Sequence, residues 1–272
     1  MNPFLIVCIL TGIIHFTETA ASSLRLAGIR TRQIATSLSF VNATLLITRT
    51  SNMLQAPFVG GLVDHSIMVG NPAYLINGFR MIIFAAFVGN LAGAICTPFF
   101  VVVFTQAILR FEKVGSVPRL IAAAFLPKNS KAIFRSFRLP TKGSFINLSL
   151  KGMPQTFLWL NLVVVSIYTI GVLSSLFAGA LVPEFRITAS QLSAIVNGIA
   201  TILLVTLVDP TCAYITDQAV RGKRKESDVR AMVFYIILGR VVGTLILSQI
   251  LFLPAAEYIK SATLLVKGMF GR

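Results

Sequence analysis

Residues 155–182 read QTFLWLNLVVVSIYTIGVLSSLFAGALV, a run of 28 residues without a charged side chain. A helix needs about 20 apolar residues to cross the hydrocarbon core of a bilayer, so this stretch predicts a membrane span. Five other stretches have a similar length and apolar composition. The sequence therefore predicts an all-α polytopic membrane protein with six transmembrane helices, at about residues 3–24, 34–63, 79–108, 155–182, 188–219 and 229–253.

The composition of the whole chain agrees with this fold class. Of its 272 residues, 56% are hydrophobic and only 12% are charged, and the mean hydropathy is +0.83. These values exclude a soluble globular domain, a disordered chain and an ordinary nucleic-acid-binding domain, so no nucleic-acid partner is expected. The apolar runs are continuous, whereas an outer-membrane barrel has alternating segments of about ten residues.

The surplus of basic residues is explained by membrane topology. The chain has 24 Lys and Arg against 9 Asp and Glu, a net charge of +15. Seventeen of the basic residues fall in the loops after the first, third and fifth predicted spans, and five fall on the opposite side. Because cytoplasmic loops carry the excess of Lys and Arg, we expect both termini outside and three basic loops in the cytoplasm.

The two halves of the chain share residues at equal spacings. At an offset of 150, the set Arg80, Phe84, Gly89, Gly93 matches the set Arg230, Phe234, Gly239, Gly243. At an offset of 153, Pro57 and Asp64 match Pro210 and Asp217. Each half holds three predicted spans, and an odd number of spans reverses the second copy. The pattern predicts a 3+3 inverted-topology repeat, an architecture common in transporters.

This repeat divides the chain into three parts, which are a first three-helix repeat at 1–115, a basic cytoplasmic linker at 116–153 and a second repeat at 154–272. The second repeat ends in an amphipathic segment after its last span. Within the linker, basic residues at spacings of three and four predict an interfacial amphipathic helix between Pro118 and Pro140. This helix either attracts anionic membrane lipids or serves as a plain anchor.

Proline and glycine suggest where the helices bend and pack. Pro57 and Pro210 lie inside apolar stretches, where proline removes a backbone hydrogen bond and kinks a helix. They are either paired hinges beside a substrate path or ordinary packing kinks. The Gly pairs of the repeat have GxxxG spacing, which favours close helix contact within one chain or in a homodimer.

Charged and amide side chains inside the predicted spans are the candidate site residues, because such groups need a partner or water inside a membrane. One interpretation is a hydrated cationic cavity that binds an anionic headgroup. The alternative is that Arg49 and Arg240 pair with Glu18 or Asp209 and hold the bundle together. The substrate-binding candidates are Arg49, Arg240, Arg25, Asn52 and Asn42, and the coupling or ion-pair candidates are Glu18, His15, Asp209 and Asp64.

Several kinds of chemistry find no support in the sequence. The three cysteines, Cys8, Cys96 and Cys212, lie in apolar stretches and predict no disulfide framework. The His15 and Glu18 pair has too few ligands for a metal site. The sequence has no Walker A, HExxH or GxSxG motif. We therefore expect no cofactor, no metal and no enzymatic reaction.

The first third of the chain resembles a known family. The stretches HFTET at 15–19, RLAGIR at 25–30, TRTSNM at 48–53 and QAP at 55–57 are similar to the Amj family of lipid II flippases. The resemblance implies a multi-pass protein of the bacterial cytoplasmic (inner) membrane that moves the undecaprenyl-pyrophosphate-linked peptidoglycan precursor to the outer leaflet. It assigns no role to single residues.

Two other functions remain open at this stage. The same architecture would serve a secondary transporter of a small anionic solute, and the chain could also be a non-catalytic subunit of a membrane complex. A membrane phosphotransferase is a more distant alternative, since the acids are scattered along the chain. The substrate also stays open between lipid II and a related polyprenyl-pyrophosphate lipid.

Overall fold

The computed structural model describes residues 2–146, 148 and 153–270, and the regular elements in this part of the chain are helices. The predicted all-α class is therefore confirmed. The α-helices are α1 Pro3–Ala21, α2 Ser23–Thr31, α3 Ile34–Met68, α4 Ala73–Val114, α5 Val117–Ala124, α6 Pro127–Arg135, α7 Gln155–Leu181, α8 Arg186–Leu203, α9 Asp209–Val220, α10 Glu226–Val242 and α11 Ser248–Phe270. Short 3-10 turns lie at Lys142–Phe145 (η1) and Pro183–Phe185 (η2), and π turns lie at Leu204–Val208 (η3) and Gly243–Leu247 (η4).

Five helical stretches in the described residues are long and apolar enough to cross a membrane. They are Pro3–Thr31, Ala73–Val114, Gln155–Leu181, Pro183–Val220 and Glu226–Phe270. The predicted span at 34–63 lies within α3, which has 35 residues but is not among these five. Its many Ser, Thr and Asn residues, together with Arg49, make α3 less apolar than the others.

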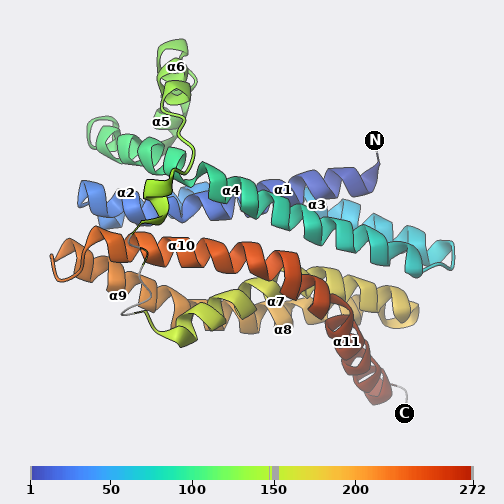
Figure 1. Cartoon of the computed structure of the whole chain (residues 1–272). Coiled ribbons are helices and arrows are strands. Elements are labelled where there is room, and N and C mark those ends of the chain that lie inside the picture. Colours follow the sequence, from blue (N-terminus) through green and yellow to red (C-terminus); the bar gives the residue numbers. More distant parts are fainter. Residues whose placement is uncertain (1, 147, 149–152, 271–272) are drawn as a thin grey trace.

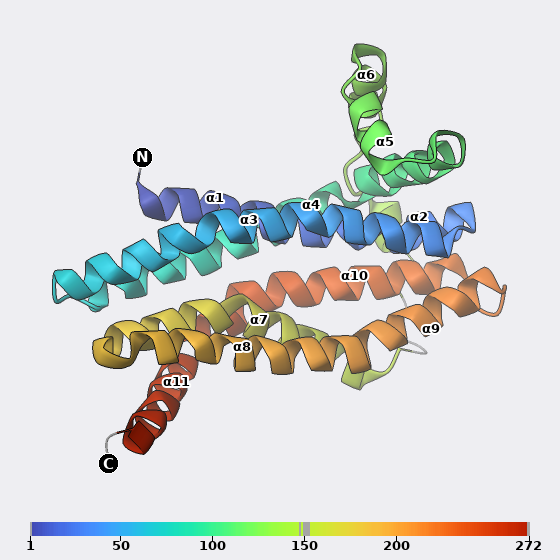
Figure 2. The same ribbon diagram turned by 180° about the vertical axis from the view of Figure 1, so that it is seen from behind.

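The long helices form two groups that lie one over the other (Figures 1 and 2). One group contains α1, α2, α3 and α4, and the other contains α7, α8, α9, α10 and α11. In Figure 1 the chain runs from right to left along α1 and α4, and from left to right along α7 and α10. Equivalent helices of the two groups therefore point in opposite directions.

The two predicted hinge prolines have different local structures. Pro57 lies inside α3, which continues through it. Pro210 lies in the first turn of α9, directly after the π turn Leu204–Val208. A proline lacks the N–H group and its ring crowds the carbonyl four residues earlier, so a widened turn at this point relieves the conflict. The role of either proline as a hinge stays a prediction.

Glycines let α4 approach α1 and let α10 approach α7. A Cβ atom at Gly89 would overlap the Gly12 carbonyl oxygen of α1, and one at Gly239 would overlap the Asn161 amide of α7. Close approach of two helices requires small residues at the contact. The matching glycines of the two halves thus make matching contacts, α4 on α1 and α10 on α7.

We expect a Gly89→Ala substitution to lower the stability of the protein strongly. The added methyl group has a backbone carbonyl in its way, and overpacking of this kind costs about 1–3 kcal/mol. Gly61→Ala is the matched control, because a Cβ atom there meets nothing within 4 Å. Thermal unfolding in detergent and the amount of protein in the membrane would measure both variants. Equal stability of the two variants would contradict this packing.

Two apolar clusters join the groups at opposite ends of the bundle. One contains Phe79 of α4, Phe177 of α7 and Phe252 of α11, all buried. The other contains Val101 of α4, Met232 of α10 and neighbours from α7 and α9. Aromatic and aliphatic side chains of this kind contribute most of the packing between helices. The polar groups described below lie between these two clusters.

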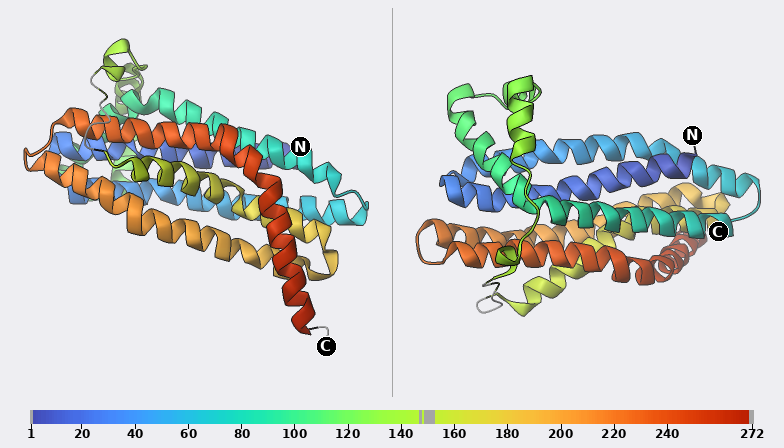
Figure 3. Two further views of the ribbon diagram at one scale, coloured as in Figure 1. Left: turned by 60° about the horizontal axis from the view of Figure 1, so that its bottom comes forward. Right: turned by 45° about the horizontal axis from the view of Figure 1, so that its top comes forward.

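The linker does not form the single amphipathic helix that the spacing of its basic residues predicted. It forms two short helices, α5 and α6, which protrude from the bundle and contain no buried residue (Figure 3). The break has a simple cause, since Leu126 precedes Pro127 and has extended backbone angles of φ −62° and ψ 137°. The residue before a proline is disfavoured in the helical conformation.

Candidate functional site

An ion pair between the two groups forms the centre of the candidate site. Arg240 of α10 donates from Nη1 to Glu18 Oε2 of α1 at 2.7 Å, and the two side chains are only 17% and 14% exposed. Arg240 Nε is buried and has no hydrogen-bond partner among the described residues. Charges are costly to bury without a partner, so each of these two side chains depends on the other. Since Glu18 lies on α1 and Arg240 on α10, the pair links the first and second halves of the chain.

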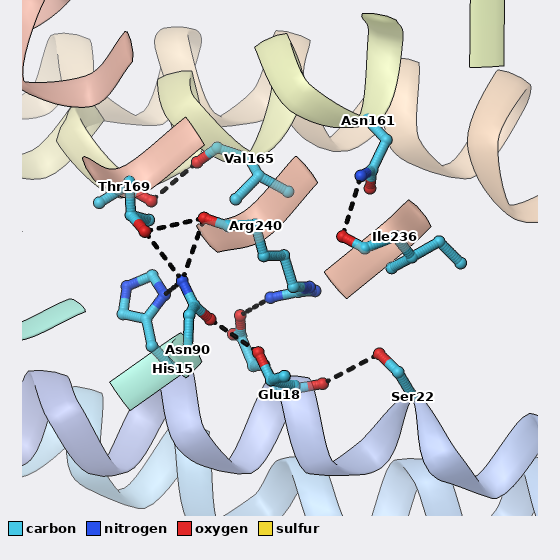
Figure 4. Close-up of polar contacts among 11 residues, drawn as sticks. His15, Glu18, Ser22, Asn90, Asn161, Val165, Thr169, Ile236 and Arg240 are labelled. Atoms are coloured by element: carbon cyan, nitrogen blue, oxygen red, sulfur yellow. Dashed lines mark hydrogen bonds and ion pairs between the residues drawn. The ribbon is translucent and has the colours of Figure 1, made fainter. Parts of the chain in front are cut away.

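Asn90 of α4 lies beside this pair and connects three helices (Figure 4). Its side chain is fully buried, and its Oδ1 accepts from Thr19 Oγ1 at 2.7 Å. Its Nδ2 donates to Thr244 Oγ1 at 3.2 Å and to the Arg240 carbonyl at 3.4 Å, and lies 3.4 Å from His15 Nδ1. The buried amide is thus satisfied, as buried polar groups must be.

Asn90 is a site residue that the sequence analysis missed. A single Asn in an apolar helix carries little signal by itself. The spacing shared by the two halves contains a clue, because Asn90 follows Gly89 as Arg240 follows Gly239. The glycine beside each polar residue brings its helix close to a partner, which places the next side chain within reach of the opposite group.

A cavity of about 490 Å³ extends from this network between the two groups of helices. Its walls come from α1, α3, α4, α7 and α8, and its polar lining includes His15, Glu18, Asn52, Gln55, Tyr168 and Asn197. No Lys or Arg is among the described lining residues. A cavity lined by hydroxyl and amide groups can form hydrogen bonds with a neutral polar ligand.

Arg49 lies outside this lining. It is an exposed residue of α3 and forms no hydrogen bond or ion pair within the described part of the chain. Of the other amides predicted on this helix, Asn52 lines the cavity, whereas Asn42 is exposed and does not.

The remaining predicted charges form bridges between the groups at the two ends of the bundle. Arg25 Nη2 contacts Asp209 Oδ1 at 3.0 Å. At the same end Arg30 contacts Glu226 at 2.8 Å. At the opposite end, exposed Asp64 lies 3.6 Å from Arg186. Arg25, Asp209 and Asp64 are therefore engaged in ion pairs. Of the two arginines that could have paired with an acid inside the bundle, Arg240 pairs with Glu18, whereas Arg49 forms no ion pair with a described residue.

Cys8, Cys96 and Cys212 are free thiols. The described residues contain no group of three or more His, Cys, Asp and Glu that could hold a metal ion. The described side chains of the site form hydrogen bonds and an ion pair.

Comparison with known proteins agrees with this membrane architecture. The sequence model of the Amj family, described as "Alternate to MurJ", matches residues 10–263. A Bacillus subtilis (strain 168) protein named "Lipid II flippase Amj" is 38% identical over 250 residues, which cover 91% of each chain. No solved structure matches the chain significantly. The resemblance seen at the first third of the sequence is therefore confirmed over most of its length, and the chain belongs to the Amj family.

Proposed function

We propose that this multi-pass membrane protein is a lipid II flippase of the bacterial cytoplasmic membrane. The observation that carries the proposal is the 38% identity, over 91% of both chains, to a protein named as a lipid II flippase. That name describes a transporter rather than an enzyme. The polar cavity between two groups of membrane helices is a feature that such a transporter needs.

The cavity suits part of the headgroup of lipid II. This lipid joins an anionic pyrophosphate and a bulky headgroup of sugar and peptide to a long apolar chain. Sugar hydroxyls and peptide amides are neutral donors and acceptors, and Gln55, Asn52 and Asn197 offer the complementary groups. With a volume of about 490 Å³, the cavity takes a portion of the headgroup in this conformation.

The proposed topology has six spans in two inverted repeats at 1–115 and 154–272, joined by the linker at 116–153. α3 is the second span, since its 35 residues extend about 50 Å at 1.5 Å per residue. The opposite directions of equivalent helices and the matching glycine contacts support the repeat. The bias of the basic loops places both termini outside.

This arrangement supports transport by alternating access, with one end of the bundle closed in the present conformation. At the end that carries the basic loops, Arg25–Asp209 and Arg30–Glu226 hold the two groups together. The cavity lies on the other side of the Glu18–Arg240 pair, toward the turn between α7 and α8. We assign this conformation to the outward-facing state of the cycle.

Arg49 is the proposed main contact for the pyrophosphate. Arg25 and Arg240 already have carboxylate partners, whereas Arg49 forms no ion pair with the described residues. An unpaired guanidinium can donate two parallel hydrogen bonds to a phosphate group. Arg240 and Arg25 would assist once the rocking of the two groups separates them from their acids.

Translocation in sealed vesicles tests the proposed function. Purified protein would be reconstituted with labelled lipid II, and an external enzyme would report the fraction in the outer leaflet over time. We expect movement well above that in protein-free vesicles, with and without an imposed proton gradient or potential. No movement in any of these conditions would contradict the proposal and favour a carrier of small anionic solutes or a subunit that needs a partner.

A further inference from the structure

A second cavity, of about 520 Å³, lies between α4 and α10 at the end of the bundle that carries the basic loops. The chain segment that leads into η1 passes in front of α4 beside it (Figure 1), and Thr141, Ser144 and Phe145 of this segment form part of the wall. The first cavity also touches α4, at Ile82 and Ile83, but no described residue lines both cavities. This second cavity, the α4–α10 groove, is therefore separate from the site described above.

The walls of the α4–α10 groove are mostly apolar and open toward the surroundings of the bundle. Leu91, Ile95 and Leu238 all line it, yet these side chains are 39%, 43% and 42% exposed. On a membrane-spanning helix, exposed leucine and isoleucine face lipid. The groove thus offers an apolar channel that a hydrocarbon chain can reach sideways from the bilayer.

One end of the groove carries two arginines. Arg30 is engaged by Glu226 at 2.8 Å. Arg230 contacts the Ile146 carbonyl from Nη2 at 3.5 Å, and its Nε is buried without a hydrogen-bond partner in the part of the chain that the structure describes. A buried donor without an acceptor is costly, and a phosphate oxygen is an acceptor that suits a guanidinium group.

The spacing shared by the two halves indicates why the Nε of Arg230 has no acceptor among the described residues. Its counterpart Arg80, 150 residues earlier, donates from Nη1 to the carbonyl and to Oε1 of Gln249, both at 3.3 Å. The residue 150 positions before Gln249 is Phe99, whose ring accepts no comparable hydrogen bond. Arg80 is therefore bonded to a side chain of the other group, whereas the Nε of Arg230 at the opposite end has no acceptor in the part of the chain that the structure describes.

We propose that the α4–α10 groove binds a polyprenyl-pyrophosphate lipid, with a phosphate on Arg230 and the start of its chain along Leu91, Ile95 and Leu238. This inference rests on the proposed function and adds to it a docking site for the substrate before transport. Leu91 and Val241 of the groove directly follow Asn90 and Arg240 of the central network.

The position of the groove argues for the transported lipid rather than for a structural phospholipid. Arg230 and Arg240 lie ten residues apart on α10, a distance of about 15 Å along the axis. A phosphate bound to Arg230 would therefore lie on the same helix as Arg240, close to the ion pair that Arg240 forms with Glu18. The groove also accepts chains from the leaflet that faces the basic loops.

Equilibrium binding of undecaprenyl pyrophosphate to the purified full chain tests this site, with native mass spectrometry in detergent as the readout. We expect Arg230→Gln to weaken binding about tenfold or more, as loss of a charge-assisted contact does. Arg230→Lys should recover part of the loss. Arg221→Gln is the matched control, because Arg221 is an exposed residue at the same end that pairs with Asp217 on its own helix.

A second variant keeps the test decisive if Arg230→Gln folds poorly. Leu238→Trp leaves Arg230 in place and obstructs the exposed mouth of the groove, so it should also weaken binding. Equal binding by all variants would overturn the proposal. A loss of binding that Arg221→Gln shares would also overturn it. The same holds if the variants lose binding of phosphatidylglycerol but keep binding of undecaprenyl pyrophosphate, since that result would assign the groove to a structural lipid.

The outcomes separate this inference from the proposed function. A wild-type protein that binds undecaprenyl pyrophosphate through Arg230 but translocates no lipid II would contradict the function and support the groove as a lipid site. If the wild-type protein translocates lipid II but Arg230→Gln binds undecaprenyl pyrophosphate normally, the proposed function is supported and the groove is contradicted as its binding site.

Discussion

Replacing Arg240 with Ala is expected to destabilise the protein severely, and Glu18→Ala should do the same. Each change leaves the other charge of the 2.7 Å pair buried without its partner. Loss of one member of a buried pair costs about 3–5 kcal/mol. Thermal unfolding in detergent and the amount of protein in the membrane would measure the loss.

The double variant Glu18→Ala with Arg240→Ala identifies the cause. Removing both charges leaves none unpaired, so we expect it to recover much of the stability that either single variant loses. Arg221→Ala is the control, since its pair with Asp217 is more than half exposed on both sides and should contribute about 0.5 kcal/mol or less. Additive losses in the double variant would show that the two residues do not depend on each other.

The same double variant separates the two roles considered for Arg240. If Arg240 only holds the two groups together, the recovered protein should still translocate lipid II. If it also contacts the pyrophosphate when the groups move apart, the protein should be stable but inactive. The proposed function gives Arg240 this second role, so we expect stable protein with transport lowered at least tenfold, a loss of about 1.4 kcal/mol in the relevant interaction.

The spans could be predicted from the sequence because the length of a membrane helix is fixed by the bilayer. The run at 155–182 corresponds closely to α7, Gln155–Leu181. The segment at 34–63 was a weaker case, since its polar residues reduce the apolar signal of α3. The break in the linker could also have been predicted from Pro127. The regular spacing of the basic residues favoured one continuous helix instead.

The candidate site was less predictable, because the partner of each charge depends on how the helices pack. The sequence allowed Arg240 to pair with either Glu18 or Asp209. In the folded chain Arg240 pairs with Glu18, and Asp209 pairs with Arg25. The cavity was expected to be cationic, yet its described lining carries amides and Glu18. Arg25 and Arg240 pair with carboxylates and are not lining residues, although Glu18, the partner of Arg240, does line the cavity.

The largest effect on transport is expected from Arg49→Ala, with the amount of folded protein unchanged. Arg49 is exposed on α3 and forms no ion pair or hydrogen bond with described residues, so its loss removes no packing or partner. Surface substitutions of this kind change stability by about 0.5 kcal/mol or less. If Arg49 is the main pyrophosphate contact, the rate of lipid II translocation in sealed vesicles should fall close to that of protein-free vesicles.

Arg49→Lys distinguishes the guanidinium from its charge. A lysine keeps the positive charge but offers a compact ammonium in place of the planar fork that binds phosphate through two hydrogen bonds. Partial transport by Arg49→Lys would therefore point to bidentate contact, and full transport would point to charge alone. Normal transport by Arg49→Ala would exclude Arg49 as the pyrophosphate contact. The anionic group would then have to be carried by arginines that are paired in this conformation, and the separation of Glu18 from Arg240 would become the step that exposes the binding charge.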